Sequence, residues 1–317
     1  MSQERSSAAP IGFVGLGTMG GPMAARLLAA GYPLVVTNRT RERAEPLLSA
    51  GASWAASPRE VGRAASGQVV FVMVTDVRAV RAVLFGRDGV ASGAGPGTLV
   101  VNTSTIAPEE SRSVAERLAR RAIRYLEAPV AGSRDAAARG ELLILTGGSD
   151  GDLATAAPLL ARIGARVEHL GPVGSAASMK LVNNLVMVAT LAADAEALVL
   201  GEALGLAPGR VIDLLLAGGG ESKVLAAKRE AFLRRDYSVR FKLALAEKDL
   251  RLVARTAREA GVRTPIGREA DRLAVEAMRA GHGEEDLAVL LEAARGRREA
   301  VRPAPVTPPT DPTPGPS

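Results

Sequence analysis

A glycine-rich turn near the start of the chain is the feature that most constrains its fold. Gly15, Gly17 and Gly20 follow the short apolar run 11–14 and precede an Ala- and Leu-rich stretch at 23–30. This order of strand, turn and helix is the context in which the spacing G-x-G-x-x-G binds a dinucleotide. The first glycine permits the tight turn, the second lets the backbone approach a pyrophosphate, and the third lets the helix pack against the strand. The sequence therefore predicts a dinucleotide site at this turn.

Every residue of the turn is a candidate contact to the dinucleotide. A helix that begins there offers unpaired backbone N–H groups and the positive end of its dipole to the phosphates. The predicted cofactor contacts in this segment are Gly15, Leu16, Gly17, Thr18, Met19 and Gly20.

The end of the second predicted strand bears on the kind of dinucleotide. NAD sites usually place Asp or Glu there to accept hydrogen bonds from the ribose, but here neutral Asn38 is followed by Arg39 and Thr40. A carboxylate would repel a 2′-phosphate, whereas a guanidinium pairs with it. Arg39, Arg41 and Arg43 also fit the solvated face of a helix start, yet cations are unfavourable there and suggest an anionic partner. The sequence therefore favours NADP(H) over NAD(H), with Asn38, Arg39 and Thr40 as contacts.

The composition excludes several other classes of function. The chain of 317 residues is long enough for about two domains. Its net charge is +6, but it has only 3% aromatic residues and no long basic run, so a small anionic molecule is a better partner than nucleic acid. It has no cysteine, and His169 and His282 are far apart, so neither thiolate chemistry nor a catalytic metal is expected.

The most apolar long stretch, 181–200, is not expected to cross a membrane. It contains Asn183, Asn184, Asp194 and Glu196, which are costly in a bilayer. The apolar stretch near the start of the chain is the glycine motif itself and does not resemble a signal region. A cytoplasmic location is therefore predicted.

Strand-like and helical patterns divide the chain into two parts. Apolar runs alternate with helical patterns up to about residue 170, which predicts crossover units and a mostly parallel, doubly wound sheet. These runs are 11–14, 34–37, 69–74, 99–101, 125–126, 142–146 and 167–170. Beyond Gly174 only long helical patterns remain, at 175–204, 208–217, 222–234, 241–260, 266–280 and 284–295. The predicted fold is an α/β Rossmann-type N-terminal domain followed by an all-α C-terminal domain.

The predicted domain borders follow from these patterns. The dinucleotide-binding domain is expected at 11–172, and a helical domain for substrate binding and dimerisation at 173–296. The leader 1–10 and the Pro-rich tail 297–317 are expected to be disordered, because neither can bury a core.

Four motifs in order link the two predicted domains. They are the glycine turn within 12–28, Glu-Ala-Pro-Val-Ala-Gly-Ser at 127–133, the segment 171–184, and Phe241 followed by Lys-Asp-Leu at 248–250. Through them the chain resembles the β-hydroxyacid dehydrogenase family, which includes 3-hydroxyisobutyrate dehydrogenases, and within it the glyoxylate/succinic semialdehyde reductase branch. The resemblance implies hydride transfer between NAD(P)H and a small acid that carries an aldehyde or a hydroxyl group.

Lys180 is the predicted catalytic residue. The resemblance implies that this lysine, on the helix between the domains, supplies the proton that the developing alkoxide needs. A lysine close to a helix N-terminus, near other cations and partly desolvated, is expected to have a lowered pKa, as a general acid/base requires. Asn184 lies four residues on, on the same helix face, and is expected to hold the substrate or to orient the lysine.

Further site residues follow other predicted strands. Ser104 and Thr105 should lie at the carboxyl edge of the sheet, where α/β folds bind ligands, although a helix N-cap explains them as well. The resemblance implies that Ser104 contacts the substrate carboxylate and Thr105 the cofactor. It also implies that Lys248 reaches over the cofactor, whereas the alternative is a surface ion pair with Asp249. The remaining predicted contacts are Val74, Thr75 and Asp76 to the cofactor, and Gly132 and Ser133 to the substrate.

One residue departs from the family pattern, because Ala131 stands where the family usually has a serine that contacts the substrate. Together with the predicted NADPH preference, the resemblance implies a reductase of glyoxylate, succinic semialdehyde or tartronate semialdehyde that forms a homodimer or homotetramer. The alternatives are an NAD-dependent 3-hydroxyisobutyrate dehydrogenase and, in another class, a non-catalytic dehydrogenase-like binding module. Lys180 argues against the binding module and against an imine reductase, both of which lack this lysine.

Overall fold

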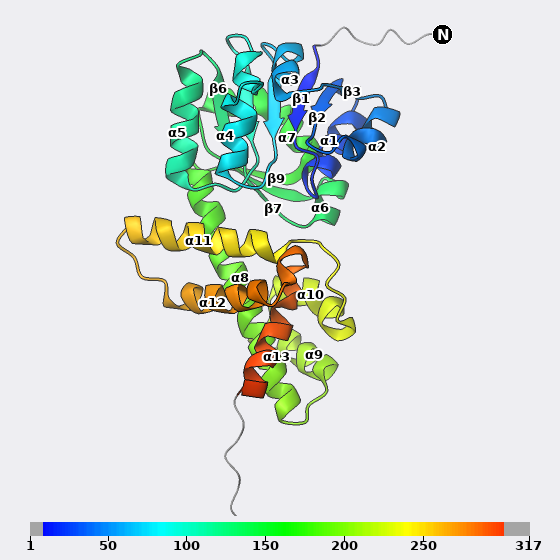
Figure 1. Ribbon diagram of the computed structural model, residues 1–317, viewed down its shortest axis with the longest axis vertical. Helices are drawn as coiled ribbons and strands as arrows, with labels where there is room; N and C mark the ends of the chain where they lie inside the picture. Colours follow the sequence, from blue (N-terminus) through cyan, green and yellow to red (C-terminus); the bar gives the residue numbers. More distant parts are fainter. Residues whose placement is uncertain (1–8, 301–317) are drawn as a thin grey trace, which may run out of the picture.

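The computed structural model describes residues 9–300 of the chain (Figure 1). Most of the predicted leader and tail lies outside the described residues, namely 1–8 and 301–317. The last helix, α13 (Leu290–Ala300), continues past residue 297, where the tail is predicted to begin. The helical part therefore extends to Ala300 rather than to 296.

A six-stranded parallel sheet forms the centre of the N-terminal part. Its strands are β1 (Ile11–Val14), β2 (Leu34–Thr37), β3 (Ser53–Trp54), β4 (Val69–Val72), β5 (Leu99–Asn102) and β6 (Arg124–Glu127), in the order β3-β2-β1-β4-β5-β6. Val14 pairs with Thr37 on one side and Val72 on the other, so these three strands end at the same edge. The strand order reverses between β1 and β4, and open α/β sheets bind ligands at such a reversal.

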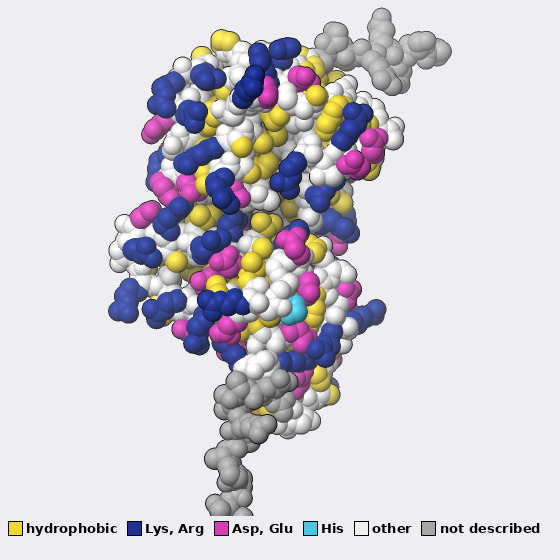
Figure 2. Space-filling view, in the orientation of Figure 1, with side chains coloured by type: hydrophobic (Ala, Val, Ile, Leu, Met, Phe, Trp, Pro, Cys, Tyr) yellow, Lys and Arg dark blue, Asp and Glu magenta, His cyan; other side chains and the backbone are white. Residues whose placement is uncertain are grey.

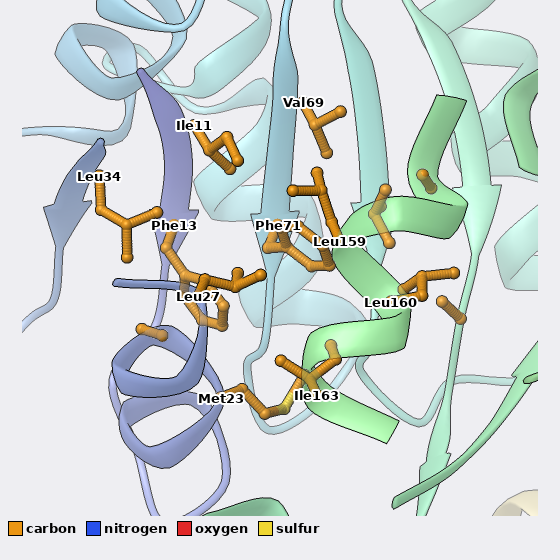
Figure 3. Packing of buried hydrophobic residues seen from close by; sticks show 14 of the residues in the cluster. Ile11, Phe13, Met23, Leu27, Leu34, Val69, Phe71, Leu159, Leu160 and Ile163 are labelled. Atoms are coloured by element: carbon orange, nitrogen blue, oxygen red, sulfur yellow. The ribbon is translucent and has the colours of Figure 1, made fainter. Parts of the chain in front are cut away.

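Helices cover both faces of this sheet, as the apolar runs predict. They are α1 (Gly20–Ala29), α2 (Glu45–Ser49), α3 (Pro58–Ala64), α4 (Val77–Phe85), α5 (Pro108–Ala119), α6 (Arg134–Arg139) and α7 (Asp150–Ile163). On one face Phe13 and Phe71 stack with ring centroids 5.6 Å apart and pack with Met23 and Leu27 of α1 and Ile163 of α7 (Figure 3). The opposite face packs against α3, α4 and α5 through a cluster that includes Val61, Val80, Leu84, Val114 and Leu118.

Two of the predicted runs form a second, separate sheet. β8 (Leu142–Thr146) pairs with the short strand β7 (Val130–Ala131) in antiparallel fashion and with β9 (Gly164–His169) in parallel fashion. The sequence does not predict β7 or β3, because two residues are too few to give a strand pattern. The segment from the end of β6 to β7 runs antiparallel to β8: the carbonyl of Pro129 accepts the N–H of Leu145, and Glu127 pairs with Gly147. This antiparallel pairing sets β8 apart from the parallel strands of the six-stranded sheet.

The C-terminal part is helical. Besides α13 it contains α8 (Ser175–Ala203), α9 (Pro208–Ala217), α10 (Lys223–Arg234), α11 (Leu243–Glu259) and α12 (Pro265–Arg279). The helix predicted at 284–295 begins only at Leu290, because Asp286 is buried and accepts the N–H groups of Arg240, Phe241 and Ala288, which holds this segment in 3-10 turns. The predicted domain border after residue 172 stays a prediction.

Helix α8 runs from the sheet through the whole helical part, and α11 and α12 cross it (Figure 1). By length and composition alone α8 could span a membrane, but half of its most apolar stretch is buried within the protein. Three buried polar residues, Lys180, Asn184 and Asp194, also lie on it. We therefore describe α8 as the core helix of the helical part.

Candidate active site

The glycine turn has the geometry that a dinucleotide requires. Gly15 has φ +98°, and a β-carbon added to it would lie 2.1 Å from the carbonyl oxygen of Met73. A β-carbon on Gly20 would lie 2.0 Å from the carbonyl oxygen of Gly15, so the turn and the start of α1 pack in direct backbone contact. Gly17 differs, because the nearest atom to a β-carbon added there would be Arg43 Nη1, at 3.9 Å. Only this glycine faces open space, which fits the role of letting a pyrophosphate approach the backbone.

Asn38 links this turn to the end of β2. Its Oδ1 accepts the N–H of Leu16 at 2.9 Å, and its Nδ2 donates to the carbonyl oxygen of Thr40 at 2.8 Å. Thr18 and Met19 complete the turn, and Met19 makes no side-chain hydrogen bond to the first turn of α1. The structure thus brings together both segments that are predicted to bind the cofactor.

The arginines that follow Asn38 differ in their surroundings. Arg41 lies over the Trp54 ring at 5.2 Å and pairs with Glu45 at 3.6 Å. Within residues 9–300, Arg39 and Arg43 make neither an ion pair nor a side-chain hydrogen bond, although Arg43 lies near Gly17. Arg39 and Arg43 therefore keep their donors available for an anion at the glycine turn, whereas Arg41 is engaged by its neighbours.

The loops after β4 and β5 are joined by Ser104. The Ser104 hydroxyl accepts the N–H of Val74 at 3.0 Å, and the side chain is 3% exposed. The alternative that these residues cap a helix is wrong, because the residue that precedes α5 is Ala107, whose N–H is bound by Glu110 at 2.9 Å. Ser104 therefore joins the loops after β4 and β5 at the carboxyl edge of the sheet. Its contact with a substrate carboxylate stays a prediction.

Thr75 and Asp76 lie where α4 begins. Asp76 accepts the N–H of Ala79 at 2.9 Å, and Thr75 donates to it at 3.3 Å. Burial tends to raise the pKa of Asp76, but the backbone N–H groups of the helix and the Thr75 hydroxyl bring it below its usual value. The carboxylate of Asp76 thus caps a helix, and its contact with a cofactor stays a prediction.

Lys180 lies in the second turn of α8 and is only 9% exposed. Burial lowers its pKa, because an ammonium group loses hydration inside the protein. The carboxylate of Asp249 opposes this shift, and the positive charge of Lys248 adds to it. The ordinary lysine pKa is therefore lowered toward the range in which the group can exchange a proton.

Asp249 on α11 is the centre of the polar group around Lys180. It is 2% exposed, accepts a hydrogen bond from Asn184 Nδ2 at 2.6 Å, and its other oxygen lies 2.8 Å from Lys248 Nζ. Lys248 Nζ also donates to the carbonyl oxygen of Thr105 at 2.8 Å. These contacts connect α8, α11 and the loop after β5, and they bring Asn184, Lys248 and Thr105 together around Asp249, whose charge acts on Lys180. That these residues bind substrate and cofactor stays a prediction.

Lys248 and Asp249 do form an ion pair, but it is not a surface pair, because the Asp249 side chain is buried and that of Lys248 is only 14% exposed. Sequence reasoning did not assign Asp249 to the site. The one feature of the sequence that points to Asp249 is its place next to Lys248. Its hydrogen-bond partner Asn184 lies 65 residues earlier, so no local pattern connects the two.

Gly132 and Ser133 lie between β7 and α6. Gly132 has φ +139°, and a β-carbon on it would lie 2.8 Å from Leu142 Cδ2, so glycine is required there. The Ser133 hydroxyl accepts the N–H of Ala136 at 3.2 Å and caps α6. Within residues 9–300 no hydrogen bond joins these two residues to Lys180, but Figure 1 shows β7 and α6 on the side of the sheet that faces α11.

Comparisons with known proteins agree with this architecture. A family model for the NAD binding domain of 6-phosphogluconate dehydrogenase matches residues 10–171, and one described as NAD-binding of NADP-dependent 3-hydroxyisobutyrate dehydrogenase matches 174–294. The chloroplastic glyoxylate/succinic semialdehyde reductase 2 of Arabidopsis thaliana is 33% identical over 288 residues, 91% of this chain and 80% of that one.

Solved structures show the same fold. A 3-hydroxyisobutyrate dehydrogenase from Salmonella typhimurium has a TM-score of 0.83 and 29% identity, covering 90% of this chain and 99% of that one. A structure of Psf3 in complex with NADP⁺ and 2-OPP has a TM-score of 0.83 and 30% identity, covering 89% and 99%.

Proposed function

This chain belongs to the β-hydroxyacid dehydrogenase family, and from this premise we propose that it is an NADPH-dependent reductase of small aldehyde-acids. It is an NAD(P)-dependent oxidoreductase that acts at a carbon bearing a hydroxyl or aldehyde group. The observation that carries the proposal is Lys180, which is buried close to Asp249 and Lys248, while Lys248 contacts the loop after β5.

In the proposed reaction, the bound nicotinamide supplies the hydride that the carbonyl carbon receives. The Lys180 ammonium group donates a proton to the carbonyl oxygen and becomes a neutral amine. Its lowered pKa makes it a stronger acid than an ordinary lysine. Asn184 and Lys248 hold Asp249, whose negative charge opposes the lowering of the Lys180 pKa by burial.

The preference for NADPH is supported by the end of β2. Asn38 replaces the carboxylate that would repel a 2′-phosphate, and its amide is held by Leu16 and Thr40. Arg39 follows Asn38 directly, and Arg43 Nη1 would lie 3.9 Å from a β-carbon on Gly17, so these two arginines are the proposed partners of that phosphate.

The substrate class is supported by the basic and hydrogen-bonding groups at the sheet edge and by the relatives. We propose glyoxylate, succinic semialdehyde or tartronate semialdehyde, with the carboxylate near Ser104, Gly132 and Ser133. The test is to assay each of these acids with NADPH and with NADH and to monitor the reaction by the loss of absorbance of the reduced cofactor. Oxidation of 3-hydroxyisobutyrate with NAD as the fastest reaction would instead assign the chain to the alternative activity.

Asp249→Asn is expected to shift the pH dependence of aldehyde reduction. The rate should fall as the pH rises through the pKa of Lys180, because the proton donor is then lost. Asp249 raises that pKa, so removing its charge should move the fall to lower pH. Asp271→Asn is the matched control, since Asp271 lies on α12 and is not among the charges that shift the pKa of Lys180. If Asp249→Asn has the same pH profile as the wild type, Asp249 does not influence the pKa of Lys180, the proposed acid.

Ala131→Ser is expected to tighten the binding of acid substrates. Ala131 lies beside Gly132 at the end of β7, where an added hydroxyl can face a carboxylate. A hydrogen bond to a charged group contributes about 1.5–3 kcal/mol, and the lower end of this range corresponds to a fall of about tenfold in KM for glyoxylate. A simple uncharged aldehyde should be unaffected. If the serine raises KM for every acid, Ala131 instead makes room for a bulkier ligand and the substrate class is wrong.

We also propose that the protein is a homodimer or homotetramer in the cytoplasm. Val186 of α8 and Ile266 of α12 are 60% and 71% exposed, and they line an apolar groove between the two helices. Val182, which is 53% exposed, lies one helical turn before Val186. Exposed apolar patches of this kind are typical of interfaces. The molar mass in solution should therefore be a multiple of 32.7 kDa, and a monomer at micromolar concentration would contradict this.

A further inference from the structure

Glu127 is a buried carboxylate that the proposed reaction does not use directly. It is the last residue of β6 and is 1% exposed. Its Oε1 accepts the backbone N–H groups of Gly174, Ala176 and Ala177 at 2.8, 2.8 and 3.2 Å. These residues form the start of α8, where backbone N–H groups lack partners within the helix. The carboxylate therefore caps α8 from the sheet and balances the positive end of its dipole.

The other oxygen of Glu127 ends a chain of buried hydrogen bonds. Ser111 Oγ donates to Oε2 at 2.5 Å and lies 3.0 Å from Tyr125 Oη, which accepts from Asn102 Nδ2 at 3.0 Å. Asn102 Oδ1 in turn accepts the N–H of Ser104 at 3.2 Å. Because an ionised carboxylate only accepts, Ser111 must donate to it, which leaves Ser111 to accept from Tyr125. The chain thus has one direction, from the loop after β5 to the start of α8.

The backbone around Glu127 is shaped to admit the carboxylate. A β-carbon on Gly147 would lie 2.4 Å from its Oε1, so only glycine fits beside it. Gly174 has φ +103°, a conformation in which its N–H can point at the carboxylate at the helix start. Burial raises the pKa of Glu127, whereas Ser111 and the three N–H groups oppose that rise.

We propose that Glu127 is a positioning residue that fixes the start of α8, and with it Lys180, relative to the loop that carries Ser104 and Thr105. Lys180 follows the start of α8 by five residues, so a shift of the first helical turn moves its amine as well. A second connection runs from Thr105 through Lys248 and Asp249 to α8. Glu127 and α11 therefore hold the lysine from two sides. This inference rests on the proposed role of Lys180.

The test is Glu127→Gln, which keeps the size of the side chain and an oxygen for the helix N–H groups. Its amide NH₂ must then face Ser111 and reverse the direction of the hydrogen-bond chain. We expect kcat to fall by about 10- to 100-fold, since small misplacements of a reacting group cost this much. KM and the dissociation constant of NADPH should change less than about twofold. Glu127→Asp, which keeps the charge but is shorter, should recover part of the loss.

Ser222→Ala is the matched control, because Ser222 caps α10 through the N–H of Leu225 at 3.0 Å, away from Lys180. It should lower the melting temperature without changing kcat. A folded Glu127→Gln variant with the kcat of the wild type would overturn the proposal. If that variant does not fold, Ser111→Ala and Tyr125→Phe interrupt the hydrogen-bond chain while leaving Glu127 in place. An unchanged kcat in both variants would equally overturn the proposal.

Hydrogen exchange separates this inference from the proposed function. Amide exchange of residues 174–180 should be faster in Glu127→Gln than in the wild type, whatever the substrate is. If the wild type reduces no aldehyde-acid while this exchange still accelerates, the proposed substrate is wrong but the anchoring of α8 stands. If exchange is unchanged, Glu127 does not position α8.

Discussion

Lys180→Ala is expected to lower kcat for aldehyde reduction by about 10²–10⁴-fold, because the loss of a general acid typically costs this much. Lys180 is buried on α8, and its pKa is lowered by that burial. The glycine turn that is proposed to bind NADPH lies on another element, at the end of β1. The affinity for NADPH, measured by fluorescence titration, should therefore stay close to that of the wild type.

Lys223→Ala is the matched control for the loss of a lysine. Lys223 is the exposed first residue of α10, and its removal should leave kcat unchanged. The fall of activity at high pH, which reports the pKa of the acid, should also disappear in Lys180→Ala. A variant that keeps more than about a tenth of the wild-type kcat would assign the proton donor to another group.

Arg39→Ala is expected to weaken NADPH binding by about 10- to 100-fold, with little effect on NADH. A charge-assisted hydrogen bond contributes about 1.5–3 kcal/mol, and only NADPH carries the 2′-phosphate. Arg43→Ala should act in the same direction, because its guanidinium lies near Gly17. Dissociation constants for both cofactors in each variant measure the effect.

Arg41→Ala separates a phosphate contact from the general positive charge of this segment. Arg41 is already engaged by the Trp54 ring and by Glu45, so its removal should change the selectivity less than about threefold. A preference of the wild type for NADH, or equal losses for both cofactors in Arg39→Ala, would contradict the proposed cofactor.

The turn and strands of the N-terminal part are predictable because their signals are local. Gly15, Gly17 and Gly20 lie within six residues, and four predicted strands at 11–14, 34–37, 99–101 and 142–146 agree with the observed strands to within a residue. Short apolar runs that are buried on both faces leave few alternatives to a covered parallel sheet. The segment 171–184 is also short, and its resemblance to the family pattern points to Lys180 and Asn184 together.

The sequence by itself determined the fold class and the dinucleotide turn, because spacing along one strand or one helix carries that information, while Lys180 and Asn184 follow from the resemblance of the segment 171–184 to the family. Only the tertiary structure decided that β8 and β9 leave the main sheet, that Asp249 binds Asn184, and that Glu127 caps α8. Each of these pairs residues that are distant in the sequence, such as Asn184 and Asp249 on different helices or Glu127 and Ala177 on a strand and a helix. Their meeting depends on how whole elements pack, and that packing is set by the shape of the entire core rather than by any local pattern.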